Sequence, residues 1–222
     1  GWATLFSMVW SSAFVAGKLG LQYTDPYTLL TARFLLASVI LLFVCLPTMK
    51  KQLFSDRTLL RDGLLLGALN NALYLGLTFT ALRYISPELV IIVVSCAPFL
   101  TSIIASLLGI ERIGLRVITG IVIGFCGVLV IALARPIGTL DPLGLGLAFL
   151  GTISFSVATV FYRNRAALHS PQHVNFWQSA IATILLMPLA LYQAAQGTVT
   201  ISFLPLVSVV AYLAIVVTIG GM

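Results

Sequence analysis

The residues of this chain that could do chemistry are a few polar and aromatic side chains set at helical spacing inside long apolar stretches. Residues three, four or seven positions apart share one face of an α-helix, so each set forms a stripe. The four stripes are Trp10, Ser11, Phe14 and Lys18; Asn70, Asn71, Tyr74 and Thr78; Glu88, Ser95, Phe99 and Ser102; and Thr152, Ser156 and Thr159. Because aromatic rings accompany hydroxyls and amides, these faces suit an amphipathic organic solute better than a bare ion.

The elements that position these stripes are helices long enough to cross a bilayer. Of the 222 residues, 60% are hydrophobic and only 8% are charged, whereas a soluble domain carries about 25% charged residues. About 20 apolar residues span the hydrocarbon core. Eight stretches meet this requirement, at about 2–21, 26–46, 63–82, 88–107, 116–134, 143–162, 174–192 and 204–222. Their continuous apolar character disfavours a β-barrel and predicts an all-α polytopic membrane protein.

The basic residues are distributed unevenly between the two sets of loops. Eight of them, Lys50, Lys51, Arg57, Arg61, Arg112, Arg116, Arg163 and Arg165, fall on one side, and two, Arg83 and Arg135, fall on the other. Cytoplasmic loops carry such an excess. We therefore expect the loops 47–62, 108–116 and 163–173 to be cytoplasmic, together with the N-terminus. The net charge of +6 then reflects topology and contact with anionic lipid, not binding of nucleic acid.

The chain also contains a weak internal repeat. At an offset of 145 positions, Trp10 aligns with Phe155, Lys18 with Arg163, and Arg33 with Gln178. Five spans separate the copies, so the second copy enters the membrane upside down, as in many secondary transporters. We predict a first five-helix repeat over 1–135 and an inverted second repeat over 143–222. A complete second copy requires two further spans after Met222, giving five plus five helices, of which about eight are covered here.

Several segments resemble the EamA-type permeases of the drug/metabolite transporter (DMT) superfamily. They are WSSAFVA at 10–16, Asp25-Pro26 followed by ARFLL at 32–36, Ala97-Pro98, GIER at 109–112, and the stretch from Gly120 to Val128. The resemblance covers nearly the whole chain and implies a secondary transporter. It further implies efflux of small metabolites, amino acids or drugs across a bacterial inner membrane by alternating access. The chain departs from the family at Glu88, where small apolar residues are usual.

The stripes predict a substrate pathway. The alternative is that the same side chains have purely structural roles. The predicted pathway residues are Trp10, Ser11, Phe14, Asn70, Asn71, Tyr74, Thr78, Ser95, Phe99, Ser156 and Thr159. Ser and Thr also bond back to their own helix, and small residues ease helix packing. Arg33 and Gln178 are interpreted as structural polar residues, and Pro98 as a kink or a source of free carbonyls. Glu88 either caps a helix or couples transport to protons, if burial raises its pKa.

Enzymatic chemistry is not indicated. His169 and His173 lie four positions apart without a nearby carboxylate in the sequence, and no H-E-x-x-H, G-x-S-x-G or phosphate-cradling motif is present. The three cysteines fall within spans without metal-ligand spacing, so we expect no metal and no cofactor. The expected partners are a small-molecule substrate and membrane lipid, and a homodimer is compatible with such a chain. The alternative function is a non-transporting membrane scaffold or assembly subunit.

Overall fold

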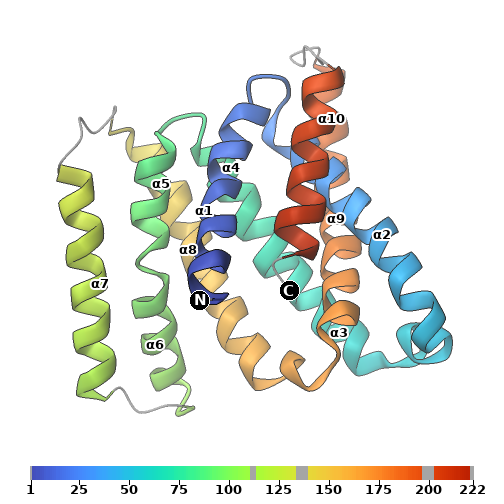
Figure 1. The fold of residues 1–222 in the computed structure, drawn as a ribbon, viewed down its shortest axis with the longest axis horizontal. Coiled ribbons are helices and arrows are strands. Elements are labelled where there is room, and N and C mark those ends of the chain that lie inside the picture. Colours follow the sequence, from blue (N-terminus) through green and yellow to red (C-terminus); the bar gives the residue numbers. More distant parts are fainter. Residues whose placement is uncertain (1, 111–113, 134–139, 197–202, 221–222) are drawn as a thin grey trace.

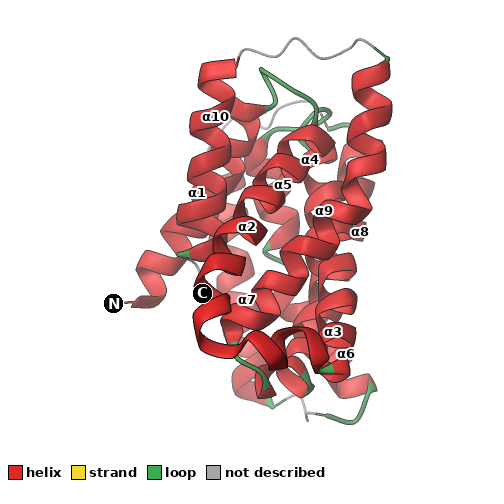
Figure 2. Cartoon of the chain, turned by 90° about the vertical axis from the view of Figure 1, so that its right-hand side faces the viewer, coloured by secondary structure: helices red, strands yellow, loops and turns green. Residues whose placement is uncertain are grey.

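A computed structural model describes residues 2–110, 114–133, 140–196 and 203–220, and every regular element in these ranges is helical. Figure 2 shows these helices running between two ends of the molecule. The elements are α1 Trp2–Gly20, α2 Pro26–Ser55, α3 Arg57–Leu66, η1 Gly67–Leu75, α4 Gly76–Ala81, α5 Pro87–Val94, α6 Ala97–Leu107, α7 Leu115–Leu133, α8 Pro142–Asn164, η2 Ala166–Leu168, α9 Pro171–Ala195, α10 Phe203–Ala211 and η3 Tyr212–Ile219.

Each of the eight predicted spans corresponds to a helix or a run of helices. Among the described residues, five helical segments are long and apolar enough to cross a membrane, and two further apolar helices are shorter. They are Pro26–Cys45, Arg57–Ala81, Pro87–Leu107, Pro142–Asn164 and Pro171–Ala195, with Leu115–Gly127 and Pro205–Ile219 as the shorter two. The prediction of an all-α polytopic membrane protein is confirmed. The prediction of a loop over 47–62 is wrong, because α2 continues to Ser55 and α3 begins at Arg57.

Three of the described spans are not continuous α-helices. The third contains the π-helical segment η1, and the eighth contains the π-helical segment η3. The fourth is interrupted at Ser95-Cys96, after which α6 begins with Pro98 in its first turn. Proline lacks the amide that a continuous helix requires there. Short π-helical segments often mark functional sites, so η1 and η3 indicate where to look for one.

Helix starts are fixed by side-chain caps and by proline. Asp25 accepts the amides of Tyr27 and Thr28 at 2.9 and 3.0 Å, and Asp141 accepts the amide of Leu143 at 2.8 Å. Such caps satisfy amides that have no partner within the helix. A proline stands in the first turn of α5, α8 and α9, where its missing amide costs nothing. Together these residues place the turns at opposite ends of the bundle (Figure 1).

Packing is closest between α9 and the first half of the chain. Helices α2 and α9 pack along each other more extensively than any other pair of described elements. Gly63 and Gly67 let the third span approach α9, since a Cβ at these glycines would lie 2.3 Å from Trp177 Cβ and 2.8 Å from Ile181 Cβ. In membranes, small residues at helix interfaces allow such close approach. By contrast, α7 stands at one edge of the bundle beside α5 and α6 (Figure 1).

Element starts recur at one interval along the chain. Pro171 begins α9 and follows Pro26, which begins α2, by 145 positions. Tyr212 begins η3 and follows Gly67, which begins η1, by the same interval. The internal repeat of the sequence has the same offset of 145 positions.

Candidate functional site

A central cavity of about 530 Å³ lies among helices drawn from both halves of the chain. Its lining residues are Trp10, Ala13 and Phe14 of α1; Arg33 and Phe34 of α2; Leu66, Asn70, Asn71, Tyr74, Leu75 and Phe79 of the third span; Phe155, Ala158, Thr159 and Tyr162 of α8; Pro171, Asn175 and Gln178 of α9; and Val217 and Thr218 of η3. The volume falls within the range of about 300–1,000 Å³ that is usual for small-molecule sites.

One wall of the cavity is aromatic. The rings of Trp10 and Phe155 have centroids 5.3 Å apart, those of Tyr74 and Phe155 are 4.7 Å apart, and those of Trp10 and Tyr74 are 6.4 Å apart. Three rings from three helices are thus in mutual contact. Aromatic pairs in this range pack favourably, and the resulting surface can receive an apolar or aromatic part of a solute.

The cavity lining also has polar groups, which are side-chain amides. Asn70 Nδ2 donates to Gln178 Oε1 at 3.1 Å and to Asn71 Oδ1 at 3.2 Å. Asn175 Nδ2 donates to the carbonyl of Thr218 at 2.9 Å. These bonds join η1 to α9 and α9 to η3. They satisfy amide groups that would otherwise be costly inside a membrane.

Arg33 is the charged residue of the lining. Its side chain is only 4% exposed, and Nε donates to the Thr218 hydroxyl at 2.9 Å. That hydroxyl donates in turn to the carbonyl of Leu213 at 2.9 Å. Nη1 of Arg33 and the hydroxyl of Tyr74 have no hydrogen-bond partner in the described part of the chain. None of the described residues that line the cavity is acidic.

The residues that line the cavity reach from Phe14 and Phe79 to Tyr162 and Pro171. At one end, Phe14 packs near Phe79 with ring centroids 6.5 Å apart, and Lys18 Nζ donates to the carbonyl of Leu82 nearby. Phe79 and Leu82 are both fully buried. At the other end, the lining includes Tyr162 and Pro171, which flank the turn between α8 and α9.

Residues 1–133 match the family model described as the EamA-like transporter family. The chain belongs to this family. Its curated relatives include the "Uncharacterized transporter YvbV" of Bacillus subtilis (strain 168), 26% identical over 156 residues, which make up 70% of this chain and 50% of that protein. Another is an "Uncharacterized transporter" of Archaeoglobus fulgidus (strain ATCC 49558 / DSM 4304 / JCM 9628 / NBRC 100126 / VC-16), 26% identical over 180 residues, 81% of this chain and 62% of that protein.

This EamA-like chain therefore spans about half to three-fifths of the length of these curated relatives. No solved structure matches it.

Six of the predicted pathway residues line the cavity, namely Trp10, Phe14, Asn70, Asn71, Tyr74 and Thr159. Arg33 and Gln178, interpreted from the sequence as structural, line it as well. Arg33 has both a structural bond and an unused donor. Its Nε bond to Thr218 connects α2 to η3, while its Nη1 atom has no hydrogen-bond partner among the described residues.

The other predicted pathway residues lie away from the cavity lining. The Thr78 hydroxyl donates to the carbonyl of Tyr74 at 2.8 Å, and the Ser95 hydroxyl donates to that of Ile91 at 2.8 Å. Back-bonding to the preceding turn therefore accounts for both hydroxyls.

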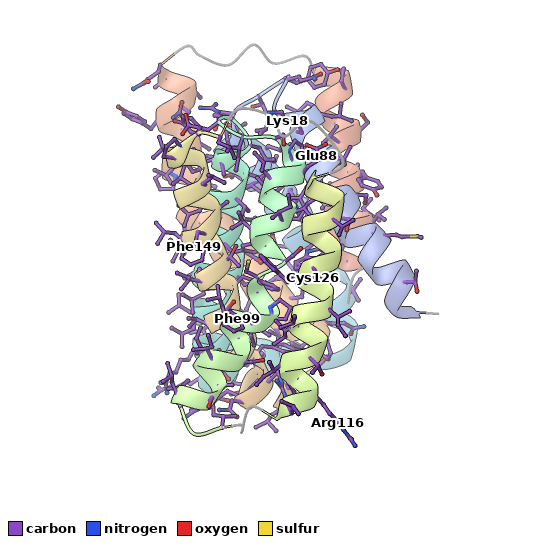
Figure 3. The ribbon with its side chains drawn as sticks, turned by 90° about the vertical axis from the view of Figure 1, so that its left-hand side faces the viewer. Lys18, Glu88, Phe99, Arg116, Cys126 and Phe149 are labelled. Carbon is purple, nitrogen blue, oxygen red and sulfur yellow. The ribbon has the colours of Figure 1, made fainter. Side chains whose placement is uncertain are left out.

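The Ser156 hydroxyl also bonds within the protein. It donates to the carbonyl of Thr152 at 2.9 Å and to that of Ala97 at 3.3 Å. Ser11 is exposed on α1. Phe99 is 51% exposed on α6, near the outward-facing α7 in Figure 3. These three side chains have the helical spacing that predicted a pathway, but they do not line the cavity.

Glu88 and Pro98 also lie away from the lining. Glu88 is in the first turn of α5, whose N-cap is Ser86, and a negative charge there is favoured by the helix dipole. Figure 3 shows Glu88 toward the same end of the molecule as Lys18, opposite to Arg116. Pro98 is exposed and lies just after the break in the fourth span.

Twelve further lining residues did not enter the predicted pathway, among them Phe155, Tyr162, Asn175 and Thr218. The sequence carried a signal for two of them. Phe155 is the repeat counterpart of Trp10, and Asn175 lies three positions before Gln178, on the same helical face. Among the described residues, no group of three or more His, Cys, Asp or Glu side chains is placed to hold a metal ion.

Proposed function

We propose that this chain is the solute-binding part of a secondary transporter that moves a small amphipathic organic solute across the membrane by alternating access. The observation that carries the proposal is the cavity itself, with its aromatic wall and its amide groups. A scaffold would have no use for about 530 Å³ of partly polar space within the membrane. Membership in the EamA-like transporter family supports the same conclusion.

We further propose that residues 1–135 and 143–222 form two inverted repeats that rock against each other. The recurring helix starts support this division. So do two pairs of repeat counterparts, Trp10 with Phe155 and Arg33 with Gln178, because all four side chains line one cavity. In transporters of this kind the solute site lies where the repeats meet, and relative rotation opens it alternately to each side.

The charge pattern supports an orientation for this movement. The exposed residues Arg57, Arg61, Arg163 and Arg165 flank the turns at the end toward which the cavity extends. Under the positive-inside rule this end is cytoplasmic, as is the N-terminus. The cavity is then accessible from the cytoplasm, which suits a bacterial inner-membrane exporter of metabolites, amino acids or drugs.

Flux measurements on the full-length protein test this proposal. Purified protein in proteoliposomes is assayed for counterflow, in which unlabelled solute inside the vesicles drives accumulation of labelled solute from outside. The panel contains amino acids, organic acids and cationic drugs, and protein-free vesicles are the control. We expect saturable counterflow for at least one solute class. Absence of flux across the whole panel would favour the scaffold or assembly role.

A further inference from the structure

We propose that Arg33 recognises a negatively charged group of the solute, and that the solute is a monoanionic carboxylate on an aromatic or other apolar body. The inference rests on the proposed transport function and specifies its substrate class. It is carried by the charge of the cavity, by the hydrogen-bonding groups that have no protein partner, and by the shape of the aromatic wall.

The first step concerns charge. Arg33 is buried among the lining residues with 4% of its side chain exposed. A buried cation is expensive unless an anion compensates it, and no acidic residue lines this cavity among the residues that the structure describes. The guanidinium carbon lies 5.3 Å from the ring centroid of Phe34, which offsets only part of this cost. The cavity therefore has an uncompensated positive charge that a bound anion would neutralise.

The second step concerns hydrogen bonding. Among the residues that the structure describes, two buried polar atoms of the lining have no hydrogen-bond partner, Arg33 Nη1 and the Tyr74 hydroxyl. A guanidinium nitrogen only donates, and a phenol hydroxyl donates readily. Both groups can therefore donate a hydrogen bond to an acceptor oxygen of the ligand. Hydrogen bonds from arginine to a carboxylate are charge-assisted and stronger than neutral ones, so a carboxylate satisfies the donors and the charge together.

The third step concerns the rest of the solute. The contact cluster of Trp10, Tyr74 and Phe155 offers ring surface beside these donors. An ammonium group on the same solute would find no carboxylate in the described lining, and a phosphate dianion would meet one cation alone. A singly charged carboxylate with an apolar body fits these features better than a zwitterion, a cation or a phosphate ester.

A matched set of four solutes tests the proposal by calorimetry on the full-length protein in nanodiscs. The solutes share a phenyl ring and a short chain: 3-phenylpropanoate, phenylalanine, phenethylamine and 3-phenylpropanol. We expect wild-type protein to bind the carboxylate about 10- to 100-fold more tightly than the alcohol, as a hydrogen-bonded charge pair allows. Arg33→Gln should remove this preference, because carboxylate binding should weaken far more than alcohol binding. Arg83→Gln, the same change at an exposed arginine, should keep it.

The outcomes separate this inference from the proposed function. Equal affinity of wild-type protein for carboxylate and alcohol, or no binding of any of the four solutes, overturns the carboxylate proposal without needing any variant. Equal loss of both ligands in a folded Arg33→Gln protein assigns Arg33 a structural role and also overturns it. If counterflow of other solutes persists in these cases, transport stands and only the substrate class is wrong. Absence of all flux refutes the proposed function itself.

Discussion

Replacing Gly67 with alanine tests the close contact between η1 and α9, on which the geometry of the cavity depends. A Cβ at this position would lie 2.8 Å from Ile181 Cβ and 2.9 Å from the carbonyl oxygen of Gln178. Neither neighbour is the far end of a flexible side chain, so the two helices must shift apart. Overpacking of this kind costs about 1–3 kcal/mol. The higher helix propensity of alanine returns about 0.5–1 kcal/mol.

The same substitution at Gly124 supplies the control. Gly124 lies on α7, and a Cβ at this position would have nothing within 4 Å, so Gly124→Ala gains helix propensity without a clash. The free energy of unfolding, measured by SDS titration in mixed micelles, should be lower for Gly67→Ala than for Gly124→Ala by about 1–3 kcal/mol. Equal stabilities would refute the close packing of η1 on α9. Solute binding should also weaken in Gly67→Ala, because the displaced carbonyl belongs to Gln178, a cavity residue.

Three further predictions concern the ends of the bundle. The Thr58 hydroxyl, followed by the amide of Leu59, holds the pKa of Asp56 below its ordinary value. The stabilisation that Asp56 contributes by capping α3 is therefore fully present above the ordinary carboxyl pKa. It is lost as the pH falls through the lowered pKa of Asp56. The melting temperatures of wild type and Asp56→Asn should therefore converge in acid, and a constant difference would contradict this. Glu88→Gln should leave the pH dependence of counterflow unchanged, since Glu88 is outside the cavity lining; a lost dependence would revive proton coupling. In a cysteine-free background, Asn164→Cys should react with an impermeant thiol reagent from the cytoplasmic side and Gln22→Cys from the opposite side, and reaction of both from one side would break the topology.

The helices could be predicted from the sequence because composition and length identify membrane spans. In the structure, caps such as Asp25 and Asp141, and prolines such as Pro171, mark where helices begin. The π-helical segments could not be predicted, because no residue type specifies an extra residue in a turn. The extension of α2 to Ser55 was missed for a different reason, since polar residues continue a helix once it leaves the membrane.

The cavity was predictable only in part. Helical spacing identified faces, and the faces that combine amides with aromatic rings, such as that of Asn70 and Tyr74, do line it. Hydroxyl residues such as Thr78 and Ser95 gave the same spacing but bond to their own helices, a choice that depends on the neighbouring helix and not on the pattern. The bond that Arg33 donates to Thr218 could not be predicted from the sequence, because the two residues lie 185 positions apart.

Counterflow by a variant with a filled cavity tests the central claim most directly. Thr159 lines the cavity, whereas Leu150 lies on the same helix with 56% of its side chain exposed. Full-length Thr159→Trp and Leu150→Trp proteins are compared with wild type in proteoliposomes, at equal amounts of folded protein, with a solute that wild type carries. If the cavity is the transport path, Thr159→Trp should reduce counterflow to the level of protein-free vesicles while Leu150→Trp retains it. Wild-type counterflow by the Thr159→Trp protein would contradict the account.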